Sequence, residues 1–193
     1  RMVVSPLQGA ANIGIWAAQV KGRLFWRSEK TGTISRSLTG GNMAGRFVHL
    51  RVHSEYSLYD STIRVKKLVQ AAADAGMPAV ALTDQANTYA LVKFYKTALG
   101  AGLKPILGAD LWLENPDDQT APFRVCALCI NDDGYKNLRE LVSRGYSQNQ
   151  HFDKAIVRKE WLFEQSAGLI LLSGGRDGDV GQRIIKGKLE AAE

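Results

Sequence analysis

Short apolar runs alternate with amphipathic stretches through most of the chain after residue 47, and this alternation limits the folds that the chain can adopt. The run at residues 79–82 contains only apolar side chains, which is typical of a parallel strand that is covered on both faces. Similar, mostly apolar runs recur at 105–113, 123–130 and 168–172. Repeated strand–helix units predict an α/β fold with a parallel sheet and right-handed crossovers, either open or closed into a barrel.

Amphipathic stretches between these runs predict the helices. We expect helices at about residues 60–75, 89–99, 133–146 and 158–164, and a last one from about residue 180. Asp60 or Ser61 is expected to cap the first helix, and Gly76 with Pro78 is expected to end it. The polar segment 114–122 is expected to form a loop.

The composition is that of a globular domain. The chain has 193 residues, of which 45% are hydrophobic, and this is enough material for one core. No run of about 18 apolar residues is present, so no membrane span is expected. Two cysteines in a chain of this length indicate a reducing compartment, and we expect a cytoplasmic protein. Cys126 and Cys129 are three residues apart on an expected strand and point to opposite faces, so we predict that they pack in the core rather than share a metal.

The positive charge is confined to the first part of the chain. The formal net charge is +6, and residues 1–46 contain seven Lys or Arg side chains and one acidic side chain. Residues 47–193 therefore carry no net charge, which argues against strong non-specific binding of nucleic acid by this part. We interpret residues 1–46 as a basic leader of low order. One hypothesis is that Met43 is the natural start; the alternative is a basic arm that touches DNA or a partner protein.

The segment 47–60 (FVHLRVHSEYSLYD) combines an expected strand with candidate ligands. Alternation assigns its first residues to two faces, Phe47, His49, Arg51 and His53 on one and Val48, Leu50 and Val52 on the other. The apolar face is expected to lie in a core. Imidazoles two residues apart, followed by the carboxylate of Asp60, are a common beginning of a metal site, whereas surface or hydrogen-bonded histidines are the alternative.

Polar residues also follow the other expected strands, and function in βα folds gathers at the carboxyl ends of strands. These ends are Arg51 with His53, residues 83–85, residues 109–110 and residues 173–175. We predict that one pocket at these ends contains His53, Asp60, Asp110, Arg51 and Arg124.

Five segments resemble, in order, the motifs of the PHP (polymerase and histidinol phosphatase) domain. Residues 49–54 (HLRVHS), 83–87 (TDQAN) and 104–110 (KPILGAD) are similar to its D-L-H-V-H-T, T-D-H-G-N and K-P-I-x-G-x-E. Arg124 stands where metal-binding members have a histidine, and residues 171–175 (LLSGG) stand where they have S-G-C. The first motif, in its longer form, resembles the start of bacterial DNA polymerase III alpha subunits.

The resemblance covers about residues 47–193, which we interpret as a partial PHP domain. It implies a PHP-type distorted (β/α)7 barrel, truncated here, with parallel strands and flanking helices. Because a truncated barrel leaves an unpaired edge, we expect marginal stability, aggregation or dimer formation for the chain alone.

The resemblance assigns eight positions to the family's metal site: Arg51, His53, Asp60, Asp84, Gln85, Asp110, Arg124 and Gly175. Three of the family's histidines are replaced, by Arg51, Gln85 and Arg124. Its cysteine is replaced by Gly175, which has no donor atom, and its glutamate by the shorter Asp110.

The substitutions predict a degenerate site without metal and without catalytic residues. Two guanidiniums oppose a divalent cation, and they can neutralise the remaining carboxylates. Expected ion pairs are Arg51 with Asp110 or Arg124 with Asp60. Asp84 is expected beside the ligand positions rather than among them.

The resemblance also implies a parent protein that is a DNA-directed DNA polymerase. Such a nucleotidyltransferase of chromosomal replication uses Mg²⁺ at an acidic site outside these residues. The PHP part is expected to be structural and to dock a separate proofreading exonuclease subunit, with DNA and other replicase subunits as partners of the parent. One alternative is an active metal-dependent phosphoesterase or built-in 3′–5′ proofreading exonuclease, which the lost ligands disfavour. A nucleic-acid-binding module is the other, which the balanced charge disfavours.

Overall fold

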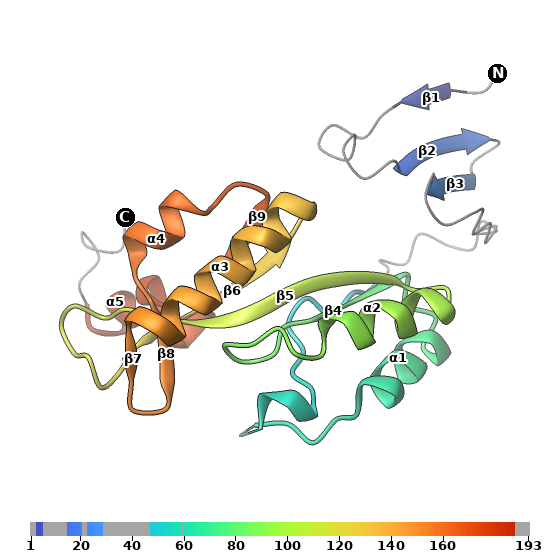
Figure 1. Ribbon diagram of the computed structural model, residues 1–193. Coiled ribbons are helices and arrows are strands. Elements are labelled where there is room, and N and C mark those ends of the chain that lie inside the picture. The colour runs from blue at the N-terminus through green and yellow to red at the C-terminus, as the bar shows by residue number, and fades with distance from the viewer. Residues whose placement is uncertain (1–2, 6–14, 21–22, 29–46, 59, 188–193) are drawn as a thin grey trace.

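The computed structural model describes residues 3–5, 15–20, 23–28, 47–58 and 60–187. A six-stranded sheet is built around one long strand, β5 (Lys104–Leu113) (Figure 1). The other strands of this sheet are β4 (Ala79–Leu82), β6 (Phe123–Cys129), β7 (Gln150–His151), β8 (Lys154–Val157) and β9 (Leu169–Leu172). Because β4, β6 and β8 all pair with β5, this strand sets the position of the rest of the sheet.

The strand directions follow the predicted parallel sheet only in part. β4 and β8 are parallel to β5, but β6 is antiparallel to β5 and β9 is antiparallel to β6. The segment 114–122 explains the first exception, because a parallel return needs a crossover of about a dozen or more residues. Asn115 shapes this short link by donating to the Ala121 carbonyl at 2.8 Å and accepting from the Asp117 amide at 3.1 Å. The result is a mixed α/β fold that contains parallel strands.

The helices lie close to their predicted positions except at the start of the first. They are α1 (Val65–Asp74), α2 (Leu91–Gly100), α3 (Asp132–Gln148), α4 (Lys159–Glu164) and α5 (Asp179–Ile185), with 3-10 turns η2 (Glu55–Ser57) and η3 (Gly175–Asp177). The predicted cap of α1 by Asp60 or Ser61 is wrong, because both side chains bond to His53 instead. In the described part of the chain, no helix has the length and apolar character that a membrane span needs.

The segment before η2 is extended but does not form a regular strand of the sheet. The His49 carbonyl accepts from the Ala81 amide at 2.9 Å, and the Val52 carbonyl accepts from the Thr83 amide at 2.8 Å. From His49 to Val52 the chain advances by three residues, whereas the neighbouring segment advances by two, from Ala81 to Thr83. The extra residue interrupts the alternation of side chains, as in a β-bulge. The prediction that Leu50 faces the core is wrong for this reason, since it is 42% exposed.

Two apolar clusters make up most of the core. In the first cluster, α3 and α4 pack on β5 and β6, and its members include Leu111, Val125, Leu138 and Trp161. In the second, α1 and α2 pack on β4, and its members include Val69, Val80, Leu82 and Phe94. Figure 1 shows the arrangement of these helices and strands. Cys126 lies in a third, small cluster with Ala81, whereas Cys129 contacts the first, so the prediction that the thiols pack separately is confirmed. Burial raises the pKa of Cys126 to about 11 and that of Cys129 to about 12.

The described part of the leader forms a three-stranded antiparallel sheet. Its order is β1 (Val3–Ser5), β2 (Ile15–Val20), β3 (Arg23–Ser28). The sequence pattern did not predict these strands. Residues 29–46, including Met43, lie outside the described residues.

Candidate functional site

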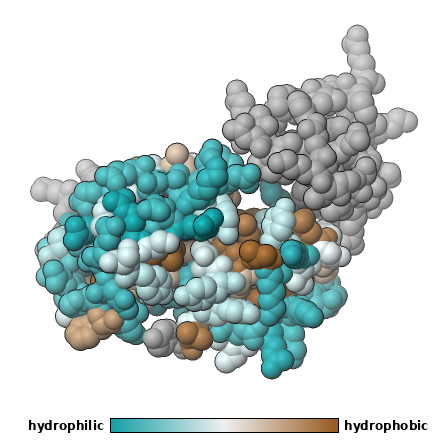
Figure 2. Space-filling model, in the orientation of Figure 1, coloured by the Kyte–Doolittle hydropathy of each residue, from teal (hydrophilic) through white to brown (hydrophobic). Residues whose placement is uncertain are grey.

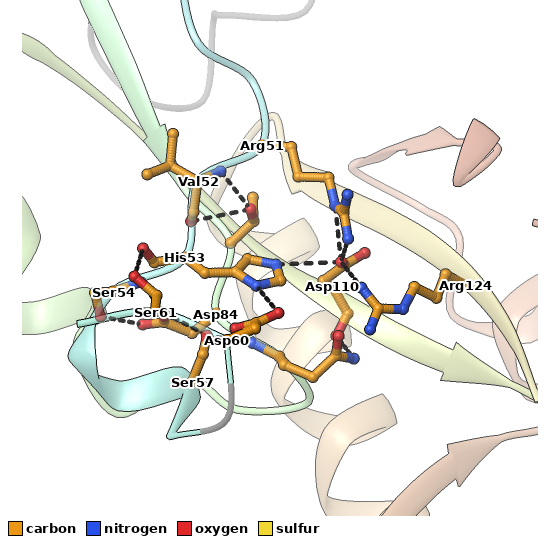
Figure 3. Close-up of polar contacts among 12 residues, drawn as sticks. Arg51, Val52, His53, Ser54, Ser57, Asp60, Ser61, Asp84, Asp110 and Arg124 are labelled. Atoms are coloured by element: carbon orange, nitrogen blue, oxygen red, sulfur yellow. Dashed lines mark hydrogen bonds and ion pairs between the residues drawn. The ribbon is translucent and has the colours of Figure 1, made fainter. Parts of the chain in front are cut away.

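The carboxylate of Asp110, in β5, is the centre of a charged network (Figure 3). Its side chain has no exposed surface, and its Oδ2 accepts hydrogen bonds from Nε of Arg51 at 2.8 Å and from Nη2 of the same guanidinium. Nε2 of His53 lies 3.2 Å from this oxygen, and Nη1 of Arg124 lies 3.8 Å from it. The expected Arg51–Asp110 pair is therefore present, whereas Arg124 approaches Asp110 and not Asp60, with which it was expected to pair.

Neighbouring segments bring these side chains together. Asp110 is opposite Cys126 in the β5–β6 register, and Arg124 is opposite Trp112, two residues farther along β5. Residues two apart on a strand point to the same face, so Asp110, Trp112 and Arg124 share one face of the sheet. Arg51 comes from the extended segment that bonds alongside β4, which pairs with the first half of β5.

His53 bridges two carboxylates. Its Nδ1 lies 2.7 Å from Oδ2 of Asp60, and its Nε2 faces Asp110 (Figure 3). Burial lowers the pKa of His53, but the hydrogen bonds and charges of Asp110 and Asp60 outweigh it, and the pKa is raised overall. An imidazolium donates from both nitrogens, so this geometry suits the protonated form and leaves no nitrogen lone pair for a metal.

Asp84 forms a second buried carboxylate site of a different kind. Its Oδ1 accepts from the Ser54 amide at 2.6 Å and from the Ser57 hydroxyl at 2.9 Å. Its Oδ2 accepts from the Ser54 hydroxyl at 2.8 Å. These donors are neutral and belong to the turn around η2, so Asp84 ties this turn to the residues after β4.

Gln85 lies next to Asp110 in a parallel bridge between two segments. Its Nε2 donates to the Asp110 carbonyl at 2.9 Å. Gln85 Oε1 and Asp110 Oδ1 are both buried and have no hydrogen-bond partner among the described residues. Most buried polar atoms form hydrogen bonds, so these two are exceptions. The charged groups around Asp110 approach Oδ2, and Oδ1 remains able to accept a hydrogen bond.

Gly175 begins the turn η3 after β9, next to Gly174, which packs against the backbone of Arg124. Its neighbour Gly174 has a φ of +67°, and a Cβ atom there would lie 2.2 Å from the Arg124 carbonyl oxygen. Gly175 has a φ of +56°, with open space where a Cβ would be. The position is thus near the network but supplies no side chain to it.

Sequence reasoning missed Trp112. The Trp112 ring centre lies 4.6 Å from the Arg124 guanidinium and 5.0 Å from the Lys154 ammonium, and such cation–π contacts hold Arg124 in position. The spacing of two residues from Asp110 could have identified Trp112. His49, predicted on the same face as His53, packs edge-on against Phe47 with ring centres 4.6 Å apart.

The residues present do not fit a divalent metal ion. In the described part of the chain, no three His, Cys, Asp or Glu side chains are grouped so that they could hold one. Oδ2 of Asp110 is already paired with Arg51 and Arg124, and both nitrogens of His53 face carboxylates. A divalent cation would have to displace these partners against the repulsion of two guanidiniums.

Comparisons with known proteins agree with the sequence motifs. Alpha subunits of DNA polymerase III from Pseudomonas fluorescens and Escherichia coli (strain K12) are 50% and 46% identical to this chain over 151 and 145 residues. These matches cover 78% and 74% of this chain but only 13% and 12% of the relatives. An amidohydrolase structure from Chromobacterium violaceum has a TM-score of 0.39 and 17% identity, and the match covers 50% of this chain and 34% of that one. The family model of the PHP domain matches residues 49–193, and the chain therefore belongs to the PHP domain family.

Proposed function

We propose that this chain is the PHP part of a bacterial DNA polymerase III alpha subunit. The 46–50% identity to two such subunits supports this, although the chain spans only 12–13% of their length. The whole protein is then a DNA-directed DNA polymerase, a nucleotidyltransferase that uses Mg²⁺ in chromosomal replication in the cytoplasm. The parallel pairing of β4 and β8 with β5 supports a place for this chain within a PHP-type distorted (β/α)7 barrel.

We infer that the domain performs no metal chemistry and is a structural unit. The observation that carries this inference is the contact of Asp110 with Arg51 and Arg124. Fixed guanidiniums neutralise the buried carboxylate that a metal ion would otherwise neutralise, so the site holds together without one.

The docking of a proofreading exonuclease subunit is the second role that we propose. Exposed apolar side chains support a protein contact, and Figure 2 shows apolar patches on one face of the molecule. Single exposed apolar residues are common, but Leu58 is 79% exposed and also has a φ of +63°. A sparsely populated backbone conformation costs on the order of 1–3 kcal/mol, so a strained, exposed leucine two residues before Asp60 is a candidate anchor.

A chimera tests both parts of the proposal. The segment of the Pseudomonas fluorescens alpha subunit that aligns with residues 47–187 is replaced by those residues, and primer extension and co-purification of the proofreading subunit are measured. We expect both to be retained. Loss of primer extension in a chimera that folds would contradict the assignment to this polymerase.

Leu58→Asp in the same chimera tests the docking surface. We expect weaker co-purification and unchanged primer extension. Phe163→Asp on α4 is the matched control, because Phe163 is 78% exposed and lies on a different element. Equal effects of the two substitutions would rule out Leu58 as the anchor.

A further inference from the structure

A pocket of about 330 Å³ lies beside the charged network. Trp112 and Arg124 line it from β5 and β6, and Asp177, Gln182 and Lys186 line it from η3, α5 and the residue after α5. Its volume lies at the lower end of the range for pockets that bind small molecules. Arg124 belongs to both sites, since it also faces Asp110 (Figure 3).

Arg124 is fixed in position, but its donors are little used. The guanidinium stacks on Trp112 at 4.6 Å and lies 3.8 Å from Asp110 Oδ2, which is too long for a hydrogen bond. Its side chain forms no hydrogen bond with the described residues and is 24% exposed. A guanidinium that is already oriented and has unused N–H groups at a pocket wall is suited to bidentate binding of an oxyanion.

The surroundings of the pocket favour an anion. Lys186 lines the pocket, and Lys154 lies over the Trp112 ring at 5.0 Å. Asp177 is the acidic side chain of the lining, and Asp118, outside it, interacts electrostatically with Lys186. Arg51, the second guanidinium on Asp110, is 44% exposed and adds to the positive potential nearby.

We propose that this pocket binds a small phosphate monoester with a planar or apolar body. The phosphate contacts Arg124 and Lys186, and the body lies against Trp112 and Phe123, which form part of the apolar wall. A phosphate monoester carries close to two negative charges at neutral pH and matches two cations better than a carboxylate does. The proposal does not depend on the polymerase assignment, because only residues of this pocket carry it.

Calorimetric titration of the complete chain at low ionic strength tests the proposal. The probes are deoxyadenosine 5′-monophosphate, deoxyadenosine and inorganic phosphate. We expect saturable binding of the monophosphate, weaker binding of inorganic phosphate and none of the nucleoside. Absence of saturable monophosphate binding would overturn the proposal, and so would equal affinity for the nucleoside. Equal affinity for inorganic phosphate would overturn the role of the Trp112 wall.

Arg124→Gln provides the decisive variant. We expect the affinity for the monophosphate to fall by about tenfold or more, as for a lost hydrogen bond to a charged group. Arg139→Gln is the matched control, because Arg139 also stacks on an aromatic ring, Tyr135 at 5.7 Å, but lies on α3 outside the pocket. Equal losses in the two variants would overturn the assignment.

A second variant keeps the test valid if Arg124→Gln does not fold. Lys186 is exposed at the pocket wall and makes no ion pair with the described residues, so Lys186→Gln should fold normally. We expect this variant to bind the monophosphate severalfold more weakly. An unchanged affinity would contradict the proposed placement of the phosphate.

Discussion

Two buried carboxylates, Asp84 just after β4 and Asp110 within the neighbouring strand β5, are satisfied in opposite ways. Asp84 accepts from one backbone amide and two serine hydroxyls, all neutral and all from the turn around η2. Asp110 faces two guanidiniums and an imidazole, and all of them converge on one oxygen while the other has no partner among the described residues. Asp84 thus has a structural role, because it holds the turn around η2 in place. Asp110 lies in a cluster of charged side chains, as is typical of a functional site.

The two sites differ in whether the carboxylate is paired with positively charged side chains. A carboxylate bonded by neutral donors needs no counter-ion beyond those hydrogen bonds. Asp110, by contrast, is paired with cations that come from other segments of the chain. We infer that Arg51 and Arg124 replace a metal in neutralising Asp110.

Asp110→Asn should have the largest effect. The substitution leaves Arg51, Arg124 and protonated His53 close together without their shared anion, and we expect a loss of about 3–5 kcal/mol in the free energy of unfolding. Chemical denaturation followed by circular dichroism measures it. Adding Arg51→Met to this variant should restore part of the loss by removing one uncompensated cation. A loss similar to that of an exposed substitution would show that Asp110 is not the centre of the network.

Asp84→Asn should cost less, about 1–3 kcal/mol, because neutral donors lose an acceptor but no charge is left unpaired. The same denaturation experiment applies. Since no cation faces Asp84 among its described hydrogen bonds, adding Arg51→Met should not restore stability here. A rescue in both backgrounds would mean that the two carboxylates belong to one electrostatic site.

Restoring the family's ligands should convert the Asp110 site into one that binds a metal ion. The variant with Arg51→His, Gln85→His, Arg124→His and Gly175→Cys should gain measurable zinc or manganese binding in a longer protein that supplies the remaining ligands. Arg51→His alone should gain little, because the second guanidinium remains. Gly175 has room for a side chain, but its φ of +56° strains a cysteine, so the gain will be partial. A folded fourfold variant that binds no metal would show that these positions are not ligand positions.

The smallest expected effect is a dependence of stability on pH through His53. Its folded pKa is raised, so its contribution is fully present below the unfolded value of about 6.5 and is lost as the pH rises through the folded value. The free energy of unfolding should therefore decline as the pH rises above about 6.5, and His53→Gln should reduce this decline. His151→Gln, in the β7–β8 hairpin, is the control. Stability that rises over this interval because of His53 would contradict the bridging geometry.

Local patterns predicted most of the elements, but not their arrangement. The apolar run 79–82 and the amphipathic helix α2 depend on neighbours in sequence, so their positions were predicted well. The direction of β6 was not predicted correctly. Repeated βα units led us to expect a parallel strand, although segment 114–122 is too short for a parallel crossover. The exposure of Leu50 was also missed, since a single extra residue reverses the alternation.

The parts of the candidate site that belong to sequence motifs could be predicted. The parts that depend on tertiary packing could not. The Arg51–Asp110 pair followed from the replaced ligands. The partners of Asp84 lie 27 and 30 residues away in sequence, and no local spacing indicates that Ser54 and Ser57 donate to it. Asp60 was expected as a helix cap as well as a site residue, and only the fold shows that it bonds to His53.

Metal uptake by the unmodified chain tests the central claim most directly. The protein is equilibrated with excess zinc or manganese, dialysed, and analysed for bound metal by mass spectrometry. Because Arg51 and Arg124 neutralise Asp110, we predict that no stoichiometric metal is retained and that the melting temperature does not rise with added metal. Stoichiometric retention that Asp110→Asn abolishes would contradict the account.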